Sequence, residues 1–260
     1  MQTTKIKGRT FYLMPCDTCG TEIKRIKSAI KESNRCRKCA SLINIEKALA
    51  ISTNQNQQDS NYFSSMTLQA CYWAGFIAAD GYINNEQGKL EISIKDEGHL
   101  NKFKEDSLST NKIEKLVLNR GYLVGTTQER IRITNRKWLS DLENLFNIKS
   151  KKSLTHEAPN VSTWSTEQIK AFIVGYIDGD GCITGFEKGD GQLNICGTVE
   201  FLTFIKDFFE STYNIKLSDK CIRESTKIHR LFLYCAKALK ILTDLKQLPI
   251  YKLERKWCKV

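Results

Sequence analysis

One short phrase occurs twice in this chain of 260 residues, and its two copies lie 100 positions apart. Residues 73–81 have the sequence WAGFIAADG, and residues 173–181 have the sequence IVGYIDGDG. Each copy is an apolar segment that ends in Asp-Gly. A repeat at this distance indicates two structurally similar halves. We therefore expect the two halves to bring Asp80 and Asp180 to one shared site.

The repeat extends beyond the two phrases. Matching residues recur at the same offset, in the pairs Ile83 and Ile183, Ile131 and Leu231, Ile133 and Leu233, Leu139 and Leu239, Leu142 and Leu242, and Lys152 and Lys252. Between the first pair and the later ones the register slips by three residues, because Leu-Glu-Ile at 90–92 corresponds to Leu-Asn-Ile at 193–195. A loop insertion in one copy produces such a slip. The halves are predicted to span residues 66–160 and 164–260.

The charge of the chain is uneven. Lys and Arg outnumber Asp and Glu by 40 to 29, for a net charge of +11, and the first 50 residues alone carry 11 basic and 4 acidic side chains. A basic head suits a polyanionic partner, most simply nucleic acid, whereas a solvated basic surface without a partner is the alternative. No stretch approaches the roughly 18 apolar residues of a membrane span, and the first residues lack the apolar segment of a secretory signal. We expect an intracellular protein that needs no membrane.

Four clustered cysteines predict a metal site in the basic head. Cys16 and Cys19 form one Cys-x-x-Cys pair, and Cys36 and Cys39 form a second after 16 intervening residues. This spacing is typical of a tetrahedral structural Zn²⁺ site rather than of disulfides, and four thiolates leave no position open for catalysis. We predict a zinc-ribbon-like module over 1–45 and a polar linker over 46–65. Basic side chains around the cysteines favour contact with a phosphate backbone, and docking of another protein is the alternative.

Two helices are predicted around the repeated phrase. Thr67 can cap the first helix, and Ser165 with Gln168 can form a capping box at the start of the second. Gly75 and Gly175 lie inside these helices at a cost of roughly 1 kcal/mol each relative to alanine, which close backbone contact between the helices would explain. Helices packed side by side in the same direction would place the two aspartates next to each other at their carboxyl ends.

Two neighbouring carboxylates at the negative ends of two helix dipoles repel each other unless a cation lies between them. Oxygen ligands of this kind, together with substrate phosphates and water, suit Mg²⁺, which polarises a phosphate and lowers the pKa of an attacking water. The two aspartates are thus candidate ligands of a catalytic Mg²⁺. The three histidines, His99, His156 and His229, lack the spacing of metal ligands and are interpreted as structural or surface residues.

The paired phrases resemble the signature of the LAGLIDADG homing endonucleases, in the single-chain form whose two halves mimic a dimer. The resemblance covers residues 66–260, including 146–153 and 248–252, which are similar to the ends of the family's repeats. It implies an α+β fold of two pseudo-symmetric αββαββα halves whose sheets form a DNA-binding saddle. The zinc module lies outside the part that the resemblance covers.

By the same resemblance, the last acid of each phrase binds metal at a scissile phosphate. The family also places a basic residue near the metals to stabilise charge or orient water, and Lys152 and Lys252 are the matching residues. An earlier acid of the signature, usually structural, is Asp178 in the second copy and is replaced by Ala78 in the first. The resemblance therefore implies that Asp80, Asp180 and the two lysines form the catalytic site.

Alternating polar and apolar residues predict strands whose polar faces can read base edges in the major groove of DNA. The candidate contact residues are Lys89, Ser93, Lys95, Arg130 and Arg132 in the first half and Gln192, Asn194 and Thr198 in the second. Hairpin tips are predicted at 84–88 and 185–191, positioned to extend along the groove. An ordinary solvent-facing strand surface is the alternative for each of these side chains.

These features favour a site-specific double-strand DNA endonuclease that hydrolyses phosphodiesters with a divalent metal. Unlike reading surfaces in the two halves favour a monomer on a long, non-palindromic site. A non-cleaving protein on the same scaffold, either an intron-RNA maturase or a DNA-binding regulator, is the alternative. A scaffold that depends only on zinc would leave the paired aspartates unexplained.

Overall fold

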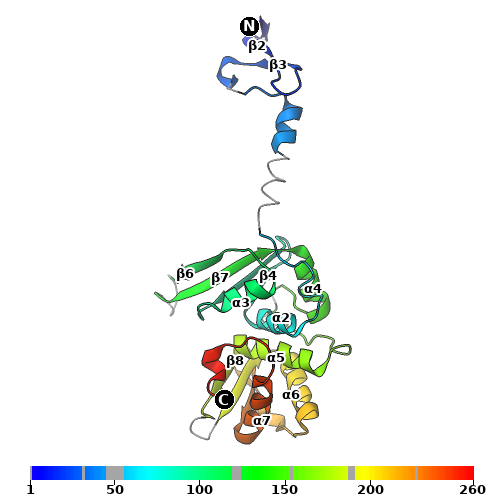
Figure 1. Cartoon of the computed structure of the whole chain (residues 1–260), viewed down its shortest axis with the longest axis vertical. Helices are drawn as coiled ribbons and strands as arrows, with labels where there is room; N and C mark the ends of the chain where they lie inside the picture. Colours follow the sequence, from blue (N-terminus) through cyan, green and yellow to red (C-terminus); the bar gives the residue numbers. More distant parts are fainter. Residues whose placement is uncertain are drawn as a thin grey trace. The chain divides into compact units, whose positions relative to one another are not determined.

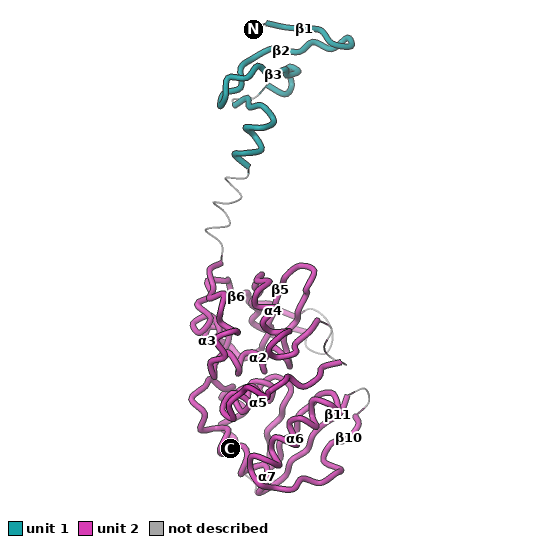
Figure 2. Tube along the Cα trace, turned by 90° about the vertical axis from the view of Figure 1, so that its right-hand side faces the viewer, with its two compact units in different colours: residues 1–55 teal, residues 56–260 magenta. Residues whose placement is uncertain are grey.

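The computed structural model describes residues 2–30, 33–44, 56–118, 124–150, 152, 155–186, 191–225 and 228–260. The chain forms two compact units, Met1–Gln55 and Asn56–Val260, which Figure 2 draws in teal and magenta. No helix in the described part of the chain is both long and apolar enough to span a membrane.

The first unit is a small antiparallel sheet followed by two helical segments. Its strands are β1 (Gln2–Ile6), β2 (Arg9–Pro15) and β3 (Glu22–Arg25), hydrogen-bonded in the order β1-β2-β3. A 3-10 turn, η1 (Lys27–Ala29), follows, and residues 37–44 are helical. Met14, Cys16 and Cys39 are its buried hydrophobic residues among those described, so apolar packing alone gives this unit a very small core.

The second unit repeats one order of elements, helix-strand-strand-helix-strand-strand-helix. The first half consists of α2 (Leu68–Asp80), β4 (Tyr82–Asn84), β5 (Lys89–Ile94), α3 (His99–Asp106), β6 (Ile113–Val117), β7 (Thr127–Thr134) and α4 (Arg136–Phe146). The second half consists of α5 (Thr166–Asp180), β8 (Gly181–Thr184), β9 (Gln192–Gly197), α6 (Val199–Tyr213), β10 (Ile222–Ser225), β11 (Ile228–Tyr234) and α7 (Cys235–Lys246). A 3-10 turn, η5 (Asp219–Cys221), precedes β10, and a short helix, α8 (Glu254–Trp257), follows α7. Two αββαββα halves were predicted, and the structure confirms them.

The two sheets have the same topology, β4-β5-β7-β6 in the first half and β8-β9-β11-β10 in the second. Their registers also correspond. Tyr82 pairs with Glu91 in the first sheet, and Cys182 pairs with Asn194 in the second. The predicted three-residue slip of the repeat is therefore correct. The turn at residues 85–88 forms as expected, whereas residues 187–190 of the second hairpin tip lie outside the described residues.

Each sheet buries one face and leaves the other polar. In the first half Leu90, Ile92 and Ile131 are at most 2% exposed on the buried face. The matching face of the second half buries Leu193 and Ile195 completely. Burial of such a side chain stabilises the fold by about 1.5–3 kcal/mol, so the period-two pattern fixes which face meets the helices. Figure 1 shows α2 and α5 next to each other between the two sheets.

The expected linker over 46–65 ends earlier than its composition suggests. Residues 45–55 lie outside the described part, but the chain belongs to the second unit from Asn56 onward. Tyr62 and Phe63 are buried against Trp138, with ring centroids 5.9 and 5.2 Å from it. The indole of Trp138 also donates a hydrogen bond of 2.8 Å to the carbonyl of Asp59. These aromatic contacts order a segment whose polar residues alone favour a coil.

Candidate active site

The helices α2 and α5 pack backbone against backbone. A Cβ atom at Gly75 would lie 1.9 Å from the Phe172 carbonyl oxygen, and one at Gly175 would lie 1.8 Å from the Tyr72 carbonyl oxygen. Any side chain at either position would therefore push the helices apart. Both predicted helix starts are confirmed, since the Thr67 side chain caps α2 and the capping box caps α5. The helices run in the same direction and end together at Asp80 and Asp180.

The glycine after each aspartate is required by close packing. Gly81 and Gly181 have φ values of −76° and −96°, so neither adopts the left-handed conformation that commonly ends a helix at glycine. A Cβ atom at Gly81 would lie 2.7 Å from the Ile77 carbonyl oxygen, and one at Gly181 would lie 2.6 Å from that of Ile177. The chain can therefore leave the helix in an extended conformation directly behind each carboxylate.

The two carboxylates share one electrostatic environment. Asp80 is exposed at the end of α2, but the protein around its carboxyl group partly shields it from water. This loss of solvation raises the pKa of the carboxyl group. Burial, followed by repulsion from Asp80, raises the pKa of Asp180 to about 6. A pair of carboxylates that resists full ionisation is stabilised by a cation placed between them. These two oxygen donors therefore fit a divalent cation, as the sequence suggested.

A buried lysine holds the end of each helix. Lys152 donates hydrogen bonds to the carbonyl oxygens of Ala79 and Gly81, at 3.2 and 2.6 Å. Lys256 donates to four carbonyl oxygens at the end of α5, those of Ile177, Asp178, Gly179 and Gly181, at 2.6 to 3.2 Å. A cation at the carboxyl end of a helix satisfies its free carbonyls and opposes its dipole. The lysines thus neutralise the helix ends that carry the aspartates.

Lys252, which the sequence repeat paired with Lys152, lies elsewhere. Its ammonium group donates to the carbonyl oxygens of Leu248 and Ile250, at 2.6 and 3.3 Å. Lys152 follows the end of α4 by six residues (152 − 146), whereas Lys256 follows the end of α7 by ten (256 − 246). The lysine that occupies the equivalent position is therefore Lys256, four positions after Lys252. Sequence reasoning missed Lys256, because a constant offset of 100 residues was carried through this insertion.

Charge is coupled across the two halves. Burial lowers the pKa of both Lys152 and Lys256, and the aspartates partly restore it. Lys256 lowers the pKa of Asp80 more than Lys152 does, whereas Lys152 acts more strongly than Lys256 on Asp180. Each lysine therefore caps the helix of its own half and acts most on the carboxylate of the other. The site works as one electrostatic unit.

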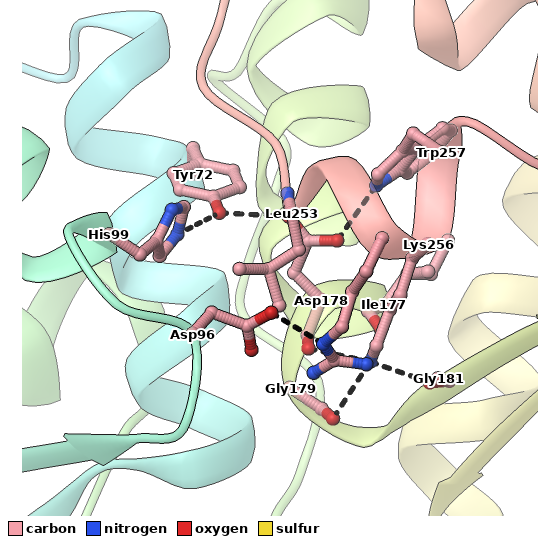
Figure 3. Close-up of polar contacts among 11 residues, drawn as sticks. Tyr72, Asp96, His99, Ile177, Asp178, Gly179, Gly181, Leu253, Lys256 and Trp257 are labelled. Carbon is pink, nitrogen blue, oxygen red and sulfur yellow. Dashed lines mark hydrogen bonds and ion pairs between the residues drawn. The ribbon is translucent and has the colours of Figure 1, made fainter. Parts of the chain in front are cut away.

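Asp178 fastens the end of the chain to this site (Figure 3). It is 1% exposed, and its carboxylate accepts hydrogen bonds from Tyr72 Oη, Leu253 N and Trp257 Nε1, at 2.8, 2.8 and 2.7 Å. Burial raises the pKa of Asp178, and these three donors oppose that rise. The hydroxyl of Tyr72 also bonds to His99 Nε2 at 2.8 Å. Asp178 is a structural hub, and it orients α8, which carries Lys256.

The polar face of the first sheet is a network of ion pairs around Glu91. Arg132 Nε lies 2.9 Å from Glu91 Oε2, and Lys89 Nζ lies 3.3 Å from the same oxygen. Arg130 lies 3.6 Å from Glu91 and 2.7 Å from Glu114. Burial alone would raise the pKa of Glu91, but hydrogen bonds from Arg132 and Lys89 outweigh burial and lower this pKa. Three of the predicted contact residues are therefore paired with acids, while Ser93 shares their face and Lys95 lies just beyond β5.

The polar face of the second sheet carries aromatic rings instead. Gln192 and Asn194 lie on it as predicted, opposite Tyr234 and Phe232. The rings of Phe232 and Tyr234 stack at 6.2 Å, and the Arg223 guanidinium lies 5.1 Å from the Phe232 ring centre. Thr198, by contrast, lies outside β9.

Thr198 caps α6, because its hydroxyl oxygen accepts a hydrogen bond from Phe201 N at 3.3 Å. The same hydroxyl donates to the carbonyl oxygen of His156. The strand ends at Gly197, so the alternating pattern was extended one residue too far into a helix cap.

The four cysteines of the first unit form one cluster. Their sulfur atoms all lie within 4.8 Å of one another, and Cys19 Sγ lies 3.8 Å from Cys36 Sγ. A tetrahedral Zn²⁺ with Zn–S bonds of about 2.3 Å separates its sulfurs by about 3.8 Å. The backbone N–H of Cys36 lowers the pKa of Cys16 to about 6, whereas bonds with Cys19 and Cys36 raise that of Cys39. Four thiols this close need a cation to ionise together, so the donor set fits a metal ion.

The comparisons with known proteins concern the fold. No protein-family model matches the sequence, and no curated protein matches it. Among solved structures, the homing endonuclease I-WcaI bound to its DNA recognition sequence aligns with a TM-score of 0.50 and 13% identity, over 76% of this chain and 90% of that chain. I-DmoI in complex with DNA and Ca aligns with a TM-score of 0.50 and 13% identity, over 77% and 97%. The chain therefore has a LAGLIDADG-like fold, preceded by a four-cysteine unit.

Proposed function

We propose that this protein is a site-specific DNA endonuclease that hydrolyses both strands of a duplex with divalent metal held by Asp80 and Asp180. The observation that carries the proposal is the pair of carboxylates at two touching helix ends, with their pKa values raised and a buried lysine behind each. The fold is shared with I-WcaI bound to its DNA recognition sequence and with I-DmoI in complex with DNA and Ca, which supports DNA as the partner.

The residues of the site have separate roles in this mechanism. Asp80 and Asp180 would hold the metal ion. Their carboxylates suit Mg²⁺, which when bound would polarise the scissile phosphate and lower the pKa of the attacking water. Lys152 and Lys256 keep both helix ends in place and bring positive charge toward the phosphates. Among the described residues, the hydrogen bonds of Lys252 go to carbonyl groups of its own loop, and we assign it no catalytic role.

The polar faces supply recognition. Arg130, Arg132 and Lys89 on the first sheet offer donors to base edges, and Gln192 and Asn194 on the second offer both donors and acceptors. Because the two halves present different groups, one chain suits one long, non-palindromic site. In the four-cysteine unit a structural Zn²⁺ holds the basic segments that contact the phosphate backbone.

Replacement of either aspartate tests the proposed chemistry. We expect Asp80→Asn and Asp180→Asn each to slow double-strand cleavage about 100-fold or more, because electrostatic stabilisation of the scissile phosphate is lost. The two variants should bind the same DNA with little change, since groove contacts remain. Cleaved sites are first selected from a random duplex library with Mg²⁺, and cleavage and binding are then measured on one selected site.

Asp141→Asn is a matched control, because Asp141 is a carboxylate on α4 paired with Lys137. It should leave cleavage unchanged. Full cutting by both active-site variants would reject the mechanism. Specific binding by the wild-type protein without any cutting would favour the alternative, a DNA-binding regulator or an intron-RNA maturase.

The cysteine cluster gives a second, independent test. Purified protein should contain about one tightly bound zinc ion per chain, and Cys16→Ser or Cys36→Ser should lose it. Cys258→Ser is the control, because Cys258 is exposed and outside the cluster. Removal of residues 1–50 should also weaken DNA binding and flatten its salt dependence. Unchanged zinc content in both cluster variants, measured by elemental analysis, would refute the site.

A further inference from the structure

His156 is buried without a hydrogen-bond partner for either ring nitrogen. The side chain is 5% exposed, and both Nδ1 and Nε2 are buried and unpaired within the described part of the chain. Its ring stacks on Tyr176 at 6.2 Å and contacts Phe201 at 4.5 Å. Each unpaired buried polar group costs about 1–3 kcal/mol, so an apolar ring would serve this packing better. The imidazole at this position therefore indicates a polar ligand.

A cavity in front of His156 gives that ligand room. Its volume is about 230 Å³, and its lining includes His156, Tyr176, Lys152, Cys196 and the carboxylate residue Asp180. A water molecule occupies about 30 Å³ in the liquid, and polar walls favour its retention. The cavity therefore has room for several waters between the imidazole and the active-site carboxylate.

The cavity belongs to one side of the active site. Asp80 does not line it, although Ala78 and Ala79 of the same helix do. The residue that corresponds to His156, four positions after the equivalent lysine, is Val260. Val260 packs against the apolar core, and its carbonyl oxygen accepts a bond from Lys246. The second half thus supplies an apolar side chain, Val260, at the position where the first half supplies the imidazole of His156.

We propose that His156 is a positioning residue that holds a chain of waters in this cavity, and that the chain keeps the hydrolytic water at Asp180 in place for cleavage of one DNA strand. The inference rests on the proposed endonuclease function. Burial lowers the pKa of His156 to about 4, so near neutral pH one ring nitrogen donates and the other accepts. The imidazole then orders waters without changing its own protonation.

The reaction balances without His156 as a reactant. The water oxygen forms a bond to phosphorus while the bond from phosphorus to the leaving sugar oxygen breaks. One proton of the attacking water passes along the water chain to solvent, and the leaving oxygen takes up one proton from solvent. Hydrolysis thus gives one phosphate monoester and one alcohol at that strand.

Strand-specific kinetics of His156 variants test the proposal. On a selected duplex with each strand labelled separately, His156→Phe should slow cleavage of one strand about 100-fold and leave the other nearly unchanged, so that nicked duplex accumulates. His156→Gln keeps a donor and an acceptor and should restore most of the rate. Phe201→Leu is the control for packing, because it removes a ring contact and should leave the ratio of the two strand rates unchanged.

A spectroscopic readout needs neither DNA nor metal. The ¹⁵N shifts of the His156 ring in the wild-type protein should show hydrogen bonds at both nitrogens, and free nitrogens would overturn the inference. Equal slowing of both strands, or none, in His156→Phe would also overturn it. If that variant does not fold, His156→Leu with the same two outcomes replaces it. A wild-type protein that cuts neither strand would overturn the proposed function. A wild-type protein that cuts both strands, together with any of the contrary outcomes above, would overturn only the role of His156.

Discussion

The two halves agree at their helix ends and differ on their sheet faces. At the helix ends each half has an aspartate, a glycine and a buried lysine in equivalent places. On the faces, Glu91 with its basic partners in the first half corresponds to Asn194 in the second, and Arg132 corresponds to Phe232. In the proposed endonuclease the equivalent helix ends serve the same catalytic task in both halves, whereas the sheet faces are free to diverge.

The divergence is also a difference in available charge. In the first half Arg130 and Arg132 form ion pairs with Glu91 and Glu114. A phosphate or a base would therefore have to compete with these ion pairs for the two guanidinium groups. In the second half Phe232 offers an apolar ring of the kind that contacts a thymine methyl group. The comparison predicts that the first half contributes more to salt-dependent affinity once its acids are removed.

The largest expected effect concerns the lysines, whose equivalence is incomplete. Among the described residues Lys256 bonds to four carbonyl oxygens and Lys152 to two, so the loss of Lys256 leaves more buried acceptors unsatisfied. We expect Lys256→Met to lower the free energy of unfolding by about 4 kcal/mol and Lys152→Met by about 2 kcal/mol. Urea unfolding of the two variants measures the difference. Equal losses would show that the number of carbonyl bonds does not matter and that the two lysines stabilise their helix ends equally.

The second prediction concerns the pH dependence of stability that a buried histidine of the first half produces. His99 in the first half is 4% exposed, and burial lowers its pKa to about 4 from an ordinary value of 6.5. Below pH 6.5 the unfolded chain binds a proton that the folded chain refuses, so stability falls as the pH drops toward 4. His99 should account for about 3 kcal/mol of this acid loss.

The variant His99→Gln isolates this contribution, because glutamine does not titrate and can still bond to Tyr72. Its free energy of unfolding should decline less between pH 6.5 and 4 than that of the wild type. Parallel stability curves from urea unfolding across this pH range would mean that His99 is protonated in the folded protein, and its bond to Tyr72 would need another explanation.

The smallest expected effect concerns the faces. Glu91→Gln should release Lys89, Arg130 and Arg132 for phosphates, strengthen DNA binding at low salt and steepen the salt dependence by about one unit of slope. The matched change in the second half, Asn194→Asp, should weaken binding, because it adds an acid to a face that has none at this position. Titrations of one selected duplex at several salt concentrations compare the two. Identical slopes in both variants would show that these faces do not meet the DNA.

Much of the fold was predictable because it depends on patterns that repeat. The apolar phrase, the strand alternation and the three-residue slip predicted both halves and their register, and the Cys-x-x-Cys pairs predicted the cluster. The packed helices that end at Asp80 and Asp180 were predicted in the same way. Each of these features is local in sequence or recurs at a fixed offset, so no knowledge of tertiary contacts was needed.

The remaining features depend on contacts between distant segments. Lys256 reaches α5 only because an insertion after α7 shifts it from the expected offset, and the ion pairs of Glu91 and Glu114 together join three strands. Tyr62 and Phe63 order a polar segment through their packing on Trp138, which no local pattern reveals. His156 was interpreted as structural, since its unpaired nitrogens become visible only when the surrounding walls are in place.

In the proposed endonuclease, the contact between the helices at Gly75 and Gly175 would also determine how far apart the two strand cuts fall. At Gly75 and Gly175 the distance between the two helices is set by main-chain atoms that already touch, so no side chain separates the helices there. In an enzyme that cuts both strands there, this backbone contact would fix the stagger between the two cuts. In the proposed endonuclease, changes to the sheet faces would change which DNA sequence is cut, yet the cut ends would keep the same overhang.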